Sequence, residues 1–143
     1  MSSDAAKSNR SDPANATHES SEFASSELSN CLLARHDPMF FSSLVIEYSR
    51  VVQLAVEESV FRTDRQVFVG IRNLARSAGE KDAVPQDLIF VHIAGLARLA
   101  KDAPRPLAKA YVQHARLLLV KMIGELALYY REQALAVRKG TEQ

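Results

Sequence analysis

The chain has 143 residues, enough for one domain, and 47% of them are hydrophobic, as in ordinary globular proteins. Its net charge of +1 divides into −3 for residues 1–30 and +4 for residues 31–143, and +4 is too small for a phosphate-binding footprint. A single cysteine, Cys31, excludes an internal disulfide and a thiolate zinc site. The N-terminus lacks the apolar segment of a secretory signal and no run of 18 apolar residues is present, so we expect a cytoplasmic protein without a membrane-spanning helix.

The first 30 residues differ in composition from the rest of the chain. They carry five acidic and two basic residues, and Phe23 is almost their only large apolar side chain before Leu28. Such a segment cannot bury enough surface to offset its chain entropy. We therefore predict a disordered serine-rich tail over residues 1–30 and a helical domain over residues 37–140, with Leu32 and Leu33 in a short amphipathic segment between them.

Two helices are predicted in the first half of the domain. The first begins at Asp37-Pro38, because Asp is a good N-cap and Pro is tolerated at the first helical position, and it ends near Phe61. Its apolar residues recur every three or four positions, at Phe41, Leu44, Val45, Tyr48, Val52 and Ala55. The second helix opens with a capping box at residues 63–66, and Gly79 is expected to end it in the left-handed conformation.

The third helix is predicted to begin at Pro85, with Asp87 in its first turn, where the helix dipole favours negative charge. It is apolar around most of its circumference, so it must be buried on more than one side. Pro104 and Pro106 separate it from a long last helix over about residues 107–139.

The last helix carries two apolar stripes and is expected to end at Gly140. One stripe is Leu107, Ala110, Tyr111, His114, Leu118, Met122, Leu126 and Tyr129; the other is Val112, Ala115, Leu119, Ile123, Ala127, Tyr130 and Ala134. One stripe suffices for packing inside a four-helix bundle, so the second predicts a further partner, most simply a second copy of the chain. A helix of this length spans about 50 Å, more than so small a core requires.

Two histidines lie on predicted apolar faces. His92 could be a phosphoacceptor with Gly95 beside it, but no lysine is near, and we interpret it as a packing histidine bonded to a neighbouring backbone group or carboxylate. His114 has Leu117 and Leu118 where a second metal ligand would stand, so we expect no metal.

No catalytic motif is recognisable. The chain has no G-x-S-x-G elbow and no glycine-rich phosphate loop, and Cys31 has no activating neighbours, so we expect a protein that is not an enzyme and needs no cofactor. Arg65, Arg72 and Arg76 share one helix face, which indicates a solvated surface or a patch for an acidic partner. Nucleic-acid binding is the less favoured alternative, because no recognition helix follows.

Two segments resemble the N-terminal domain of RsbU-type phosphatases. Residues 84–92, VPQDLIFVH, are similar to its P-x-x-I-I-x-I-H stretch, and the C-terminal domain of the clock protein KaiA has a related stretch. Residues 118–124, LLVKMIG, with Tyr-Arg-Glu at 130–132, are similar to its L-I-x-x-M-I-G…Y-x-E run. The resemblance covers roughly residues 39–135 and includes the order of the helices.

The resemblance implies a four-helix domain that dimerises and binds a partner, which is a switch kinase in RsbU-type proteins and a peptide of the clock partner in KaiA-type proteins. By motif, Leu119 and Ile123 match docking positions of the last helix, and His92 matches a histidine that we interpret as structural. The predicted partner-binding residues are Leu119, Met122, Ile123 and Tyr130. The predicted dimer and core residues are Leu88, Ile89, Val91, His92, Leu96, Leu118 and Leu126.

No phosphatase domain follows in the 143 residues, so any catalytic output is expected from another polypeptide. We expect a non-catalytic signalling adaptor that forms a homodimer through its third and fourth helices. It would bind a switch kinase or phosphatase of a partner-switching pathway. The alternatives are a histidine phosphotransfer protein and a KaiA-like activator of a clock kinase.

Overall fold

The structure, a computed structural model, describes residues 30–58 and 65–141, and these ranges contain helices and no strand. The helices are α2 (Leu32–His36), α3 (Pro38–Glu58), α4 (Arg65–Glu80), α5 (Pro85–Ala100) and α6 (Arg105–Thr141). The all-helical prediction is confirmed. The predicted disordered tail, the capping box at residues 63–66 and the end of the first helix near Phe61 lie outside the described residues.

The predicted starts of α3 and α5 are confirmed, and both depend on an aspartate. The Phe40 N–H donates a hydrogen bond to Asp37 Oδ1 at 3.2 Å, which satisfies one of the orphan donors of the first turn of α3. In α5 the Val84 N–H donates to Asp87 Oδ2 at 2.9 Å, so Asp87 closes the first turn that Pro85 opens. Hydrogen bonds between residues three positions apart are thus sufficient to determine where both helices begin.

Two predicted helix ends are wrong. Gly79 stays helical, and the chain turns instead at Asp82, whose φ is 59°. A glycine is needed at position 79 for packing and not for a turn, because a Cβ there would meet the ring of Tyr129 on α6. Gly140 also stays helical, and α6 continues to Thr141. Neither glycine therefore has the left-handed conformation that the sequence pattern predicted.

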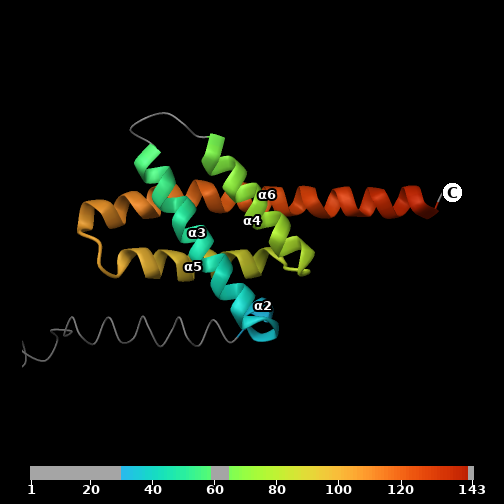
Figure 1. Ribbon diagram of the computed structural model, residues 1–143, viewed down its shortest axis with the longest axis horizontal. Coiled ribbons are helices and arrows are strands. Elements are labelled where there is room, and N and C mark those ends of the chain that lie inside the picture. The colour runs from blue at the N-terminus through green and yellow to red at the C-terminus, as the bar shows by residue number, and fades with distance from the viewer. Residues whose placement is uncertain (1–29, 59–64, 142–143) are drawn as a thin grey trace, which may run out of the picture.

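The helices form two crossing layers. The antiparallel pair α3 and α4 crosses the antiparallel pair α5 and α6, and α2 lies beside the start of α3 (Figure 1). The core lies between the layers, and its largest completely buried side chains are Tyr48, Ile71, Leu88, Met122, Leu126, Val51, Val52, Val91 and Cys31. Each layer therefore has one side on the core and one side facing outwards.

Helix α6 is longer than the core that it covers. Its 37 residues correspond to a length of about 55 Å. From Arg131 to its end every residue is exposed, and this part projects beyond the other helices (Figure 1). The surplus length predicted from the sequence is present.

By length and composition alone, α3 could also cross a membrane. Its most apolar window has a mean hydropathy of 1.3, although Glu47 and Arg50 interrupt the apolar sequence. It is the one such helix in the described ranges, and 39% of this window is buried in the fold. Its buried residues, which include Phe41, Leu44 and Tyr48, contribute to the core, as expected of a central helix in a helical protein.

Candidate functional site

The structure places the predicted dimer and core residues on both sides of the α5–α6 layer. Leu88, Val91, Leu118 and Leu126 are buried in the core. Ile89, His92 and Leu96 are half-buried. Only these three side chains of the predicted set are accessible enough for a second molecule to contact.

The predicted partner-binding residues are less accessible than expected. Met122 has no exposed surface, so its interpretation as a partner-binding residue is wrong: it is a core residue. Leu119, Ile123 and Tyr130 are half-buried and pack against the core. The Tyr130 hydroxyl also donates a hydrogen bond to the carbonyl of Ala83, which connects α6 to the turn before α5. The stripe that was expected to need a partner is thus partly covered within one chain.

His92 is held by a buried tyrosine. Tyr48, completely buried on α3, has its hydroxyl 2.6 Å from His92 Nδ1 and 3.1 Å from the carbonyl oxygen of Ala115 on α6. Because a carbonyl only accepts, the single Tyr48 proton goes to Ala115, and His92 must donate its Nδ1 proton to the tyrosine oxygen. Burial raises the pKa of Tyr48. Burial, together with nearby Arg116, lowers the pKa of His92, so the imidazole is neutral near pH 7.

This geometry fits the packing role predicted for His92. Gly95 was considered as a space for a phosphoryl group, but a Cβ there would lie 2.7 Å from Cδ1 of Tyr48. The glycine thus makes room for the tyrosine ring, which meets the His92 ring edge-on at a centroid distance of 5.7 Å. The three residues form one contact between α3 and α5.

Asp87 joins three segments at the start of α5. Besides capping α5, its carboxylate accepts hydrogen bonds of 3.4 Å from the Leu33 N–H and from the Cys31 thiol. Cys31 is completely buried, and this burial raises the pKa of its thiol, so the neutral thiol is favoured. Asp87 and Cys31 therefore hold α2 against α5, and nothing here activates the thiol as a nucleophile.

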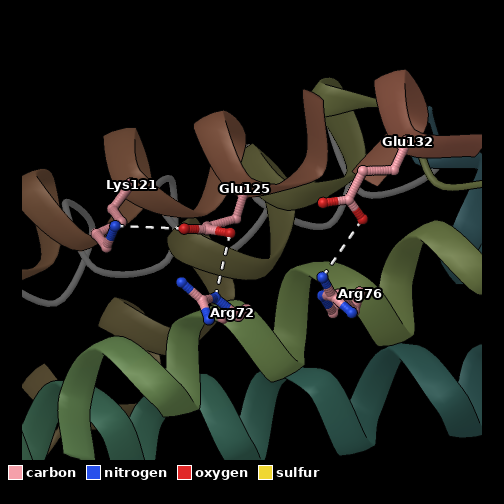
Figure 2. A network of polar contacts seen from close by, with 5 residues as sticks. All are labelled: Arg72, Arg76, Lys121, Glu125 and Glu132. Carbon is pink, nitrogen blue, oxygen red and sulfur yellow. Dashed lines mark hydrogen bonds and ion pairs between the residues drawn. The ribbon is translucent and has the colours of Figure 1, made fainter. Parts of the chain in front are cut away.

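Two of the three arginines of α4, Arg72 and Arg76, are paired within the chain. Arg72 lies 3.6 Å from Glu125, which also contacts Lys121 at 3.3 Å, and Arg76 lies 3.4 Å from Glu132 (Figure 2). The sequence left open whether the arginine face serves an acidic partner. In the structure the acidic groups that it meets belong to α6.

A row of uncharged residues lies on the outer side of α5, opposite its buried face. We call Ile89, Ile93, Leu96, Ala97 and Ala100 the α5 row; they recur every three or four residues. Ile93 is 43% exposed. At its C-terminal end the row meets a shallow hollow of about 650 Å³, lined by Ala100 and by Arg105, Pro106, Ala108, Lys109 and Val112 of α6. The row and this hollow form one largely apolar surface across α5 and α6.

A third stripe on α6 was missed by the sequence analysis. We call Leu117, Val120, Gly124, Leu128 and Leu135 the α6 strip; at 100° per residue they share the face that points away from the core. Leu117 is 74% exposed and Val120 is 71% exposed. Their spacing of three and four was readable, but two richer stripes on the same helix account for more apolar residues.

The outer side of the α3–α4 layer has a different character. Two hollows of about 340 and 280 Å³ lie between these helices, and polar side chains contribute much of their lining. These polar side chains are Arg50, Arg65, Gln66 and Asn73 in the larger hollow and Ser43, Glu47, Arg50, Asn73 and Ser77 in the smaller one. Exposed apolar side chains occur on this layer too, at Met39, Ile46, Phe68 and Val69, but its two hollows are more polar than the hollow between α5 and α6.

No group of His, Cys, Asp and Glu side chains that could hold a metal ion occurs in residues 30–58 and 65–141. Comparisons with protein-family models, with curated proteins and with solved structures gave no match to this chain.

Proposed function

We propose that this chain is a non-catalytic signalling adaptor, which pairs with a second copy through the α5 row and binds a regulatory protein through the outer side of α6. One observation carries the proposal: large apolar side chains, Ile93, Leu117 and Val120 among them, are exposed on the outer side of the α5–α6 layer. An apolar surface of this kind is typical of interaction sites.

The α5 row fits a second copy of itself. It contains no charged residue, so two copies can face each other in a symmetric dimer without like-charge repulsion. A stable dimer buries about 800 Å² on each partner. The row is about 20 Å long at the rise of a helix, and the hollow at its end, which Arg105 and Lys109 line, lies at the rim of the proposed contact.

The identity of the regulatory partner is inferred from the family resemblance. The resemblance of residues 84–92 and 118–132 to the RsbU N-terminal domain supports a four-helix unit and a switch kinase or phosphatase as the partner. The alternative function with a similar domain is a KaiA-like activator of a clock kinase. The adaptor would act by binding one conformation of its partner more tightly than another, because only unequal affinity shifts an equilibrium.

Replacing one side chain in each layer tests the dimer. Ile93→Asp places a charge in the α5 row, and Ile46→Asp places one on the outer side of α3, where Ile46 is 50% exposed against 43% for Ile93. In sedimentation equilibrium at tens of micromolar, Ile93→Asp should be monomeric, whereas Ile46→Asp should keep the mass of a dimer.

Circular dichroism shows whether both variants remain helical. A dimer that persists in folded Ile93→Asp, or that is lost equally in both variants, would contradict the assignment of the α5 row.

A further inference from the structure

We infer that the α6 strip binds an acidic amphipathic helix, which deepens the proposed function by naming the chemistry of its partner and rests on it. The strip presents Leu117, Val120, Leu128 and Leu135 to solvent, spaced as the anchors of a helix-in-groove contact are. Near its middle, a Cβ at Gly124 would meet nothing within 4 Å. A second helix can approach closely at this point.

The charges of α6 are separated between its inner and outer sides. Its only acidic residues, Glu125 and Glu132, pair with Arg72 and Arg76 of α4 (Figure 2). Both carboxylates are thereby turned towards α4 and away from the strip.

The outer flank of the strip is left with cations alone. Lys109, Arg116, Arg131 and Arg138, which we call the cation row, lie by helical periodicity along the Val120 edge of the strip, and Lys121 and Lys139 lie on its other edge. All four residues of the cation row are exposed, and none forms an ion pair with an acidic side chain in the described ranges.

This arrangement selects one class of occupant. A second copy would bring its own cation row against the first, and like charges disfavour that contact. Nucleic acid would use the cations and leave the leucines without a role. A membrane surface would bring anionic headgroups against the exposed carboxylate of Glu132 beside the other edge of the strip, and like charges disfavour that contact. A helix with apolar anchors and acidic residues along one flank satisfies both features.

The probe is a synthetic amphipathic helix with leucines at heptad spacing and glutamates along one flank. Its counterpart carries lysines in place of the glutamates. In fluorescence anisotropy at low salt, the full chain should bind the acidic peptide at least ten-fold more tightly than the basic one. Added salt should weaken this binding, because exposed charges are screened.

Matched variants on the same helix assign the site. Leu117→Asp, in the strip, should weaken binding at least ten-fold, whereas Val137→Asp should not, because Val137 is 66% exposed but lies on the opposite side of α6. The double variant Arg131→Glu with Arg138→Glu should lose binding as well. Lys101→Glu, an exposed cation before α6, should retain it.

Three results would overturn the inference: equal affinity for both peptides, unchanged binding in Leu117→Asp, or selective binding to phosphatidylserine vesicles or duplex DNA in place of the acidic peptide. The mass of the same samples separates the two proposals. Failure of peptide binding by a dimer refutes the acidic partner alone, whereas a monomer that binds the peptide refutes the dimer alone.

Discussion

Tyr48 is the residue that connects most of the structure. From α3 it reaches His92 on α5 and the Ala115 carbonyl on α6, and its ring fills the space beside Gly95. Tyr48→Phe keeps the ring and removes the hydroxyl, so half-buried His92 Nδ1 loses its partner and the Ala115 carbonyl loses its second hydrogen bond. We expect a loss of about 1–3 kcal/mol in the free energy of unfolding.

Urea denaturation followed by circular dichroism measures this loss. Tyr111→Phe is the matched control, because Tyr111 is also buried but its hydroxyl bonds to no residue in the described ranges. Equal effects of the two substitutions would show that the Tyr48 hydrogen bonds contribute nothing specific.

The lowered pKa of His92 predicts a pH dependence of stability. Since the folded protein binds this proton less readily than the unfolded chain, the His92 contribution is fully present above the unfolded pKa of about 6.5 and is lost as the pH falls below it. Between pH 7 and pH 5 the free energy of unfolding should therefore fall. His92→Gln should make this fall shallower, and an unchanged fall in His92→Gln would contradict the assignment to His92.

At this scale the sequence predicts local contacts well. Asp37 could be placed as an N-cap and Asp87 in the first turn of its helix, because the groups that they bind are within three positions. The bond from His92 to Tyr48 could not, since a histidine on an apolar helix face indicates packing but does not name a partner 44 residues away.

At the scale of elements, two glycines in helices have opposite roles. Gly79 faces the ring of Tyr129, and Gly124 faces open space. Gly79→Ala should cost about 1–3 kcal/mol of unfolding free energy, because α4 or Tyr129 must move. Gly124→Ala should gain about 0.5–1 kcal/mol, because alanine favours a helix over glycine. Thermal unfolding of both variants tests the close approach of α4 and α6, and a stabilised Gly79→Ala would refute it.

The existence and type of the helices follow from periodicity, but their outer faces do not. Predicting two stripes on α6 correctly identified its buried residues, among them Leu118 and Leu126. The sequence could not show that Leu119 and Ile123 are partly covered by the same chain, or that Leu117 and Val120 remain exposed. Exposure depends on where the neighbouring helices lie, and helical periodicity carries no information on that.

For the whole molecule, the consequence is a layer with two unlike outer surfaces. The α5 row is apolar and uncharged, and the α6 strip is apolar with the cation row along one edge. Under the two proposals above, this difference in charge would separate the surface for a second copy from the surface for an acidic partner. The projecting end of α6 extends the strip beyond the core, where a partner helix can lie along it (Figure 1).

The molar mass of the unmodified chain in solution is the most direct test of the central claim, that two copies pair through the α5 row. Multi-angle light scattering at tens of micromolar should give twice the 15.8 kDa of one chain. On dilution the mass should decrease towards that of one chain, as in a reversible association. A mass of 15.8 kDa at every concentration would contradict the central claim, because the α5 row would then face only water.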